Sequence, residues 1–229
     1  YYNVNKKVLF TTGSISFDQA EITDDTGGRG RLNGKISHEY FRKTRLDLQL
    51  DARNLLVLNT EPNFTDPYFG VGRLTGRATF TGPIDLVDIQ IRAATERGTR
   101  FAIPLDAESN RANLDFINFV SKNDTGSTVE EEKRFEVSGV NFGMNVTANP
   151  DAEFSILFDR VAGDIIRGRG NGAVEFLMNP QGEINMYGNY TFSSGDYSFT
   201  LANVPSKRFR ISEGSTIAWT GDPYDAQIN

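Results

Sequence analysis

Cysteine is absent from the 229 residues of this chain, and histidine occurs once, at His38. The absence of cysteine excludes disulfide bonds, thiolate catalysis and zinc–thiolate sites, and a single histidine excludes a metal site built from several histidines. Long apolar runs are also missing, because the longest, at residues 55–58, is far shorter than the roughly 20 residues of a transmembrane helix. Positive charge is scarce: Lys and Arg total 24 against 30 Asp and Glu. This deficit argues against a nucleic-acid partner.

The residues that are present have the pattern of a folded β protein. Hydrophobic residues make up 38% of the chain and charged residues 24%, which is enough apolar surface for a packed core. Apolar and polar residues alternate at residues 45–51 (RLDLQLD), 73–81, 153–159 and 196–201. Side chains of a strand point alternately to its two faces, so each segment is predicted to be a strand with one polar face.

Short clusters of turn-forming residues separate these segments. They occur at residues 24–28, 81–83, 149–151, 179–182, 194–196 and 221–223. Gly supplies positive φ, Pro fixes φ, and Asn and Asp tolerate left-handed backbone. Strand-sized segments between such turns predict an all-β fold with few or no helices. Only residues 107–119 fit a helix as well as a strand.

Residues 121–134, SKNDTGSTVEEEKR, are almost wholly polar and charged. We predict a mobile loop or insertion here. It would interrupt one extended sheet rather than separate two domains, so residues 1–229 are expected to form a single β domain. The chain has no initiator Met and no signal-peptide pattern at its start, and we therefore expect it to be part of a longer protein.

Two Asp-Thr-Gly triplets, at residues 25–27 and 124–126, are the strongest sign of an enzyme. Such triplets supply the paired carboxylates of aspartic proteases, which share one proton. That role needs an apolar strand that delivers each Asp into a buried cleft. Here Asp25 follows another Asp, and Asp124 lies in the most polar stretch of the chain. Turn residues explain both triplets more simply, so the protease is a remote alternative, and no catalytic residue, metal site or cofactor is predicted.

Glycine patterns that begin at Gly28 and Gly70 resemble phosphate-binding loops in spacing alone. A dinucleotide-binding loop follows a strand and opens a helix, whereas strands are predicted after both patterns. Close packing or tight bends within a sheet explain these glycines more simply. His38, which has no second histidine beside it, is predicted to be a half-exposed strand residue.

Large apolar residues recur at every second position of the predicted strands, and no helices are predicted that could cover the face they form. An all-β chain must bury this apolar face by packing sheet on sheet, by closing a barrel or by curling into a trough. A trough left open would expose an apolar patch, which marks a ligand, a partner or a membrane. The candidate residues are Leu46, Leu48, Leu50, Leu74, Phe80, Phe154, Ile156, Phe158, Phe176, Tyr190, Phe192, Tyr197, Phe199 and Leu201.

Motifs rich in glycine, aspartate and aromatic residues occur at residues 161–170, 182–190, 195–199 and 209–223. The string IAWTGDP at residues 217–223 is the most specific of them. Together they resemble the C-terminal domain of the TamB family, the translocation and assembly module subunits of the AsmA-like superfamily. Upstream, residues 76–82 and 98–105 resemble the version of this domain found in Bacteroidetes.

The resemblance implies a β-sheet folded over on itself, a β-taco with an apolar groove. It also implies a periplasmic protein that is anchored in the inner membrane by a segment outside this chain, reaches the outer membrane and meets a TamA-like barrel of the Omp85 class there. Two functions follow from it. The first is a conduit in which phospholipid acyl chains lie in the groove and move between the two membranes. The second is a platform that assembles outer-membrane proteins through exposed sheet edges.

Overall fold

The computed structural model describes residues 2–5, 8–40, 42–62, 68–104, 139–159, 163–199 and 207–229. Within these ranges the chain consists of β-strands and their connections, and a 3₁₀ turn at Pro223–Asp225 (η2) is the only helical element. The prediction of an all-β fold is confirmed. The segments at 107–119 and 121–134, for which we predicted a helix or strand and a mobile loop, lie outside the described residues.

The described strands form one sheet. In chain order they are β1 (Tyr2–Asn5), β2 (Val8–Phe10), β3 (Ser14–Asp24), β4 (Arg29–Glu39), β5 (Arg42–Thr60), β6 (Phe69–Pro83), β7 (Val87–Thr95), β8 (Arg100–Pro104), β9 (Val140–Ala148), β10 (Glu153–Asp159), β11 (Asp164–Met178), β12 (Ile184–Phe199), β13 (Lys207–Ile211), β14 (Thr216–Gly221) and β15 (Gln227–Ile228). The alternating segments at 45–51, 73–81 and 153–159 lie in β5, β6 and β10, as predicted.

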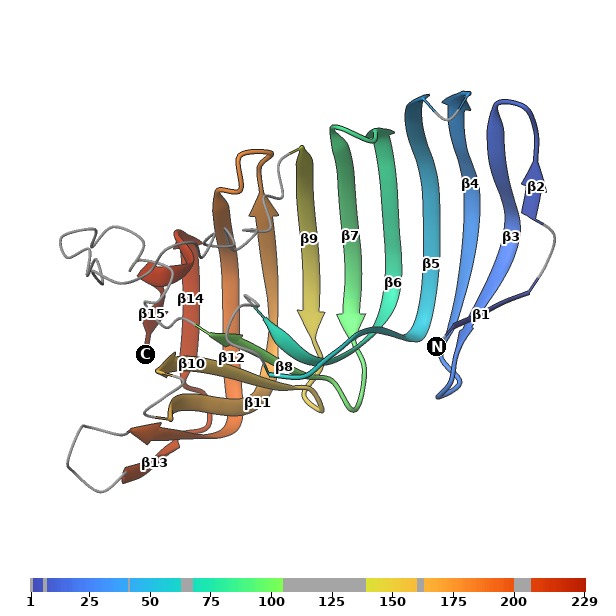
Figure 1. Cartoon of the computed structure of the whole chain (residues 1–229). Coiled ribbons are helices and arrows are strands. Elements are labelled where there is room, and N and C mark those ends of the chain that lie inside the picture. The colour runs from blue at the N-terminus through green and yellow to red at the C-terminus, as the bar shows by residue number, and fades with distance from the viewer. Residues whose placement is uncertain are drawn as a thin grey trace, which may run out of the picture.

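The sheet is antiparallel except at one seam. β7 pairs with β9 in parallel, and β8 pairs with β10 in parallel. The main path runs β1-β3-β4-β5-β6-β7-β9-β11-β12-β14-β15. Figure 1 shows β3 to β9 and then β12 and β14 following one another along this path from the N-terminal to the C-terminal end.

The long strands pair with one set of strands along one half and with another set along the other half. In β6, residues 74–81 pair with β7, but residues 69–71 pair with β8. In β11, residues 172–178 pair with β9, but residues 164–169 pair with β10. We call the part with β7, β9 and β14 the upper array, the part with β8, β10 and β13 the lower array, and the line between them the crease. In Figure 1 the lower array crosses beneath the upper one, so the sheet is folded over.

Irregularities in the strands coincide with the crease. The pairing register shifts between Ala52 and Leu55 in β5 and between Arg169 and Gly170 in β11. Short connections at residues 96–99 and 149–152 separate β7 from β8 and β9 from β10. Because a bulge inserts an unpaired residue that bends its strand, the long strands turn from one array into the other at a common level.

The turn predicted at residues 194–196 is wrong for this reason, and the turn predicted at residues 81–83 lies slightly further along the chain. Residues 194–196 lie inside β12, directly beyond the register shift at the crease. Residues 81–83 end β6, and the turn follows at residues 84–85. Small and turn-forming residues also serve where a strand bends, so local composition does not separate a bend from a turn. The turns within 24–28, 149–151 and 179–182 are confirmed.

Two buried threonines satisfy backbone groups at the crease. Thr95 and Thr99 are each 3% exposed. Thr99 Oγ1 accepts a hydrogen bond from the Arg73 N–H (3.1 Å) and donates one to the Arg73 carbonyl oxygen (3.0 Å). Thr95 Oγ1 accepts from the Asn149 N–H at 2.8 Å. These side chains replace ladder bonds that the strands lose where they separate.

Asp24 holds the crease near its N-terminal end, where its carboxylate is almost fully buried. Oδ1 accepts hydrogen bonds from the Thr26 N–H (2.8 Å), the Thr26 hydroxyl (2.6 Å) and the Gly28 N–H (2.9 Å), and Oδ2 accepts from the Leu56 N–H (2.8 Å). Burial alone would raise the pKa of Asp24, but these hydrogen bonds outweigh it and hold the pKa well below its ordinary value. The carboxylate thereby ties the β3–β4 turn to the bulge in β5.

Aromatic rings fill the crease at its C-terminal end. Tyr190, Phe192 and Ile217 are 5%, 4% and 1% exposed. The ring centroids of Tyr190 and Phe192 lie 5.1 Å apart, and those of Phe154 and Tyr190 lie 5.3 Å apart, in edge-on contacts. Gly168 on β11 leaves room for this packing, since a Cβ there would lie 2.5 Å from the Phe192 ring. The tightest core of the described residues therefore lies in the crease.

Candidate functional site

The upper array has one apolar face, built from cross-strand partners in register. Such partners point to the same side of a sheet. One row consists of Leu32, Leu50, Ala78, Ile91, Met144, Phe176 and Met186, from β4 to β12. The next row consists of Gly34, Leu48, Phe80, Ile89, Phe142, Met178 and Ile184. Both rows cross the strands without a polar side chain.

The opposite side of the upper array is a polar face. One of its rows lies next to the first apolar row, on the side away from the second, and consists of Arg31, Asp51, Arg77, Arg92, Asn145, Glu175 and Tyr187. Arg77 Nε donates to Asp51 Oδ1 at 2.7 Å, and hydrogen bonds from Arg77 and Gln49 lower the pKa of Asp51. Asn145 Nδ2 donates to Glu175 Oε1 at 3.2 Å. Water therefore solvates one side of the sheet and apolar side chains form the other.

Protein atoms cover the apolar face unevenly. Phe192 and Ile217, in the crease, are sealed from solvent. We call the apolar face of the upper array, away from the crease, the wall. Its residues Leu48, Phe80 and Phe176 are half-buried. The folded-over lower array thus closes the crease but leaves the wall above it accessible to solvent.

The lower array continues the apolar face with more aromatic side chains. The row Ile103, Ile156, Ile166, Tyr197 and Phe209 crosses β8 to β13. The other side of the lower array carries ion pairs, with Arg169 Nη2 3.6 Å from Glu153 Oε2 and Arg208 Nε 3.7 Å from Asp196 Oδ2. Both arrays therefore turn their apolar sides inward and their charged sides outward.

The residues predicted for the apolar face fall into three groups. On the upper wall lie Leu46, Leu48, Leu50, Leu74, Phe80 and Phe176; in the crease lie Tyr190 and Phe192; and on the lower array lie Phe154, Ile156, Phe158, Tyr197 and Phe199. Leu201 lies outside the described residues. Tyr190 and Phe192 belong to the sealed core, whereas the others are half-buried or, like Phe158 at 36%, exposed.

Sequence reasoning missed the middle of the wall. Ile89 and Ile91 on β7 and Phe142 and Met144 on β9 lie at the centre of the two rows. The segments VDIQIRA at residues 87–93 and VNFGMNV at 140–146 alternate as clearly as those that were recognised. Their period of two was the available signal.

The features that suggested other chemistry have structural roles here. Asp25 is exposed in the β3–β4 turn, and the second triplet lies outside the described residues. Gly34 and Gly76 lie inside β4 and β6, and a Cβ on Gly76 would lie 2.2 Å from the Arg92 carbonyl oxygen, so close strand packing accounts for this glycine. His38 is a half-buried residue of β4, as predicted. In the described part of the chain, no His, Cys, Asp and Glu side chains gather in a group able to hold a metal.

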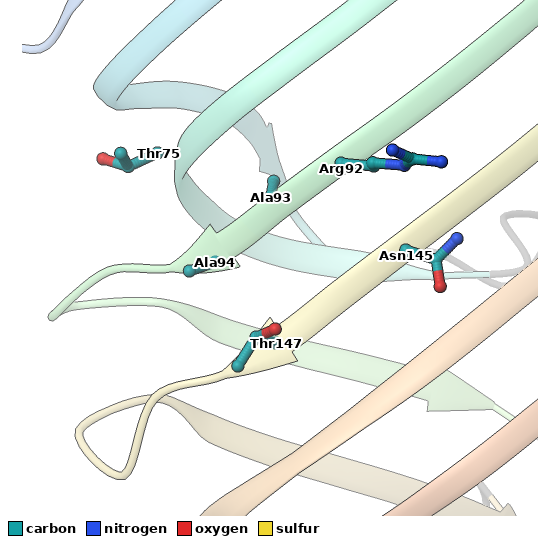
Figure 2. Close-up of a pocket in the computed structure, with 6 residues that line it drawn as sticks. All are labelled: Thr75, Arg92, Ala93, Ala94, Asn145 and Thr147. Carbon is teal, nitrogen blue, oxygen red and sulfur yellow. The ribbon is translucent and has the colours of Figure 1, made fainter.

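A hollow of about 610 Å³ lies on the polar face, where β6, β7 and β9 adjoin (Figure 2). It is lined by Thr75, Arg92, Ala93, Ala94, Asn145 and Thr147. No residue predicted for the apolar face lines it. Across the described ranges, no helix has the length and apolar character needed to cross a membrane.

Comparison with curated proteins gave no match, and comparison with solved structures gave none either. A family model described as the TamB C-terminal domain matches residues 18–229. The TamB family spans the periplasm between the two membranes, acts with a TamA-like partner of the Omp85 class in the translocation and assembly module, and is not a known enzyme family. The match covers nearly the whole chain, which therefore belongs to the TamB C-terminal domain family.

Proposed function

We propose that this chain, acting as one β domain, is a segment of a periplasm-spanning conduit that moves phospholipids between the inner and outer membranes. The observation that carries the proposal is the pair of unbroken apolar rows on the half-exposed wall of the upper array. Each row crosses seven strands from β4 to β12, a path of about 29 Å at the usual strand spacing. Acyl chains would lie along this path while headgroups remain in water.

The energetics favour such a path. Exposing a 16-carbon chain to water costs roughly 12 kcal/mol, at about 0.8 kcal/mol per CH₂. An apolar wall removes most of this barrier. It makes no directional contacts, so a chain can slide from one strand to the next without breaking hydrogen bonds. In this proposal a TamA-like barrel receives the lipid at the outer membrane, and the inner-membrane anchor lies outside this chain.

A charge on the apolar wall tests the proposal. Phe80→Asp places a carboxylate in the middle of one row, whereas Thr79→Asp places the same carboxylate on the polar face of the same strand. We expect Phe80→Asp to lower both bound phospholipid and the transfer of fluorescent phospholipid between vesicles, and Thr79→Asp to leave both near the parent values. Far-UV circular dichroism confirms that each variant is folded. A folded Phe80→Asp protein that binds and transfers lipid like the parent would refute the conduit.

A second function, assembly of outer-membrane proteins, is favoured by one edge of the lower array. Among the described strands β13 pairs with β12 alone, so its other edge can accept a further strand. Proline in place of Phe209 or Arg210 tests this role, because one of these two residues points its N–H away from β12. That variant should lose the capture of a β-strand client, while lipid along the apolar rows of the upper array remains bound. Unchanged capture by both folded variants would exclude this edge.

A further inference from the structure

The inner side of the lower array ends in a row that breaks its apolar pattern. Nearest the crease lie Phe154 and Gly168, and next come Ile166, Tyr197 and Phe209. The row farthest from the crease, where β11 begins, contains Asp164, Phe199 and Lys207. Phe199 pairs with Lys207, and Asp164 precedes Ile165, which pairs with Ser198. Asp159 of β10 pairs with Asp164, so this rim carries acidic residues on β10 and β11 and a base on β13, beside aromatic rings.

The Asp164 carboxylate is incompletely satisfied by the described residues. Its Oδ1 is buried without a hydrogen-bond partner among the residues that the structure describes, although Asp164 as a whole is partly exposed. No ion pair joins it to another described residue. Burial, followed by the hydrogen bond to Asp164 and the charge of Asp164, raises the pKa of the Tyr197 hydroxyl, so this neighbour remains a neutral donor. A carboxylate oxygen left unpaired in this way is unfavourable until a positive group joins it.

Aromatic rings gather around Tyr197, the neighbour of Asp164. The ring of Tyr197 lies 6.2 Å from that of Phe158, 6.0 Å from that of Phe199 and 6.3 Å from that of Phe209, measured between centroids. Phe158 is 36% exposed and Phe209 is 51% exposed, so a ligand can reach their faces. The faces of aromatic rings attract ammonium groups. The carboxylate and the rings therefore favour the same kind of ligand.

Lys207 supplies the complementary charge. It is exposed and makes no ion pair with a described residue. Asp164 and Lys207 lie on either side of β12, about 10 Å apart at the backbone, and Phe199 lies between them in the same row. In a zwitterionic phospholipid a short ethyl linker joins an ammonium group to a phosphate. The acid and the base at the rim are arranged to meet these two charges.

We propose that this rim binds the headgroup of an ammonium-bearing phospholipid, with the ammonium against Asp164 and the rings and the phosphate against Lys207. The proposal rests on the proposed conduit, because acyl chains on the rows nearer the crease would bring the headgroup to the rim. It adds a preference between lipids, which an apolar wall alone does not provide.

Native mass spectrometry of the whole chain, incubated with equal amounts of phosphatidylethanolamine and phosphatidylglycerol that have identical acyl chains, tests the preference. We expect the parent chain to favour phosphatidylethanolamine by about tenfold. Asp164→Asn should bring the ratio close to one with little change in total bound lipid. Asp196→Asn, which removes the same charge from the outward side of the same array, should leave the ratio unchanged.

The possible outcomes separate the two proposals. If no lipid binds, the conduit itself fails. If lipid binds with no preference, or if Asp196→Asn shifts the ratio as much as Asp164→Asn does, the headgroup site is wrong and the conduit stands. Lys207→Gln should weaken the binding of both lipids alike. If the total amount of bound lipid is unchanged, Lys207 does not contact the phosphate. Displacement of bound lipid by glycerophosphoethanolamine, which has no acyl chains, would assign the rim to a soluble ligand instead.

Discussion

Replacing Asp24 by Asn tests whether a single buried carboxylate holds the crease. The two Asp24 oxygens accept four hydrogen bonds, from the Thr26 N–H and hydroxyl, the Gly28 N–H and the Leu56 N–H. Asn has a single acceptor oxygen, so its amide NH₂ must face at least one of these donors. An unpaired buried donor costs about 1–3 kcal/mol, and the remaining bonds lose the help of a full charge.

We therefore expect Asp24→Asn to lower the free energy of unfolding by about 3 kcal/mol. Urea denaturation, followed by far-UV circular dichroism, measures the change. Asp25→Asn, at the exposed neighbouring position of the same turn, is the matched control and should alter stability by less than about 0.5 kcal/mol. Equal effects of the two substitutions would show that the carboxylate does not hold the crease.

The pH dependence of this difference follows from the lowered pKa of Asp24. Because the folded chain holds the proton more weakly than the unfolded chain, the contribution of Asp24 is complete above its ordinary pKa of 3.8 and is lost as the pH falls below that value. The stability gap between the parent and Asp24→Asn should be constant near neutral pH and shrink in acid. A gap that stays constant at low pH would contradict the assignment.

Four further substitutions examine the core, the wall and the packing between strands. Tyr190→Phe removes a buried hydroxyl that has no hydrogen-bond partner among the described residues and should raise stability by about 1 kcal/mol; a lower melting temperature would mean that the hydroxyl is paired. Phe192→Ala, in the sealed crease, should cost about 3–5 kcal/mol, and Phe176→Ala, on the half-exposed wall, clearly less; equal losses in urea denaturation would mean that the wall is ordinary core. Gly76→Val must displace the Arg92 carbonyl and should unfold the chain at lower urea; an unchanged midpoint would show that the strands have room there.

The strands were predictable because their signal is local. In RLDLQLD at residues 45–51 the period of two is complete within the segment, and β5 contains it. The folded-over sheet was expected from the family resemblance, which rests on motifs near the C-terminus such as IAWTGDP at 217–223. Neither inference required knowledge of which strands pair.

The crease was not predictable, because it depends on partners far apart in the sequence. Asp24 looked like one more turn residue, and nothing near it in the sequence reveals that its second oxygen binds the Leu56 N–H. Residues 194–196 have the composition of a turn, but they continue β12 because β11 and β13 supply partners on both sides. The rim that contains Asp164 and Lys207 was not predicted for the same reason. The two residues are far apart in the sequence, and only the pairing of β11 and β13 with β12 brings them into one row.

Lipid analysis of the purified chain gives the most direct test of whether the apolar face carries hydrocarbon. The chain is first incubated with phospholipid vesicles, separated from them and then weighed by native mass spectrometry. We expect masses of one or more intact phospholipids above that of the chain, and fewer of them for Phe80→Asp. A chain that stays free of lipid after this treatment would contradict the conduit, and its sheet edges would then be the surface to study.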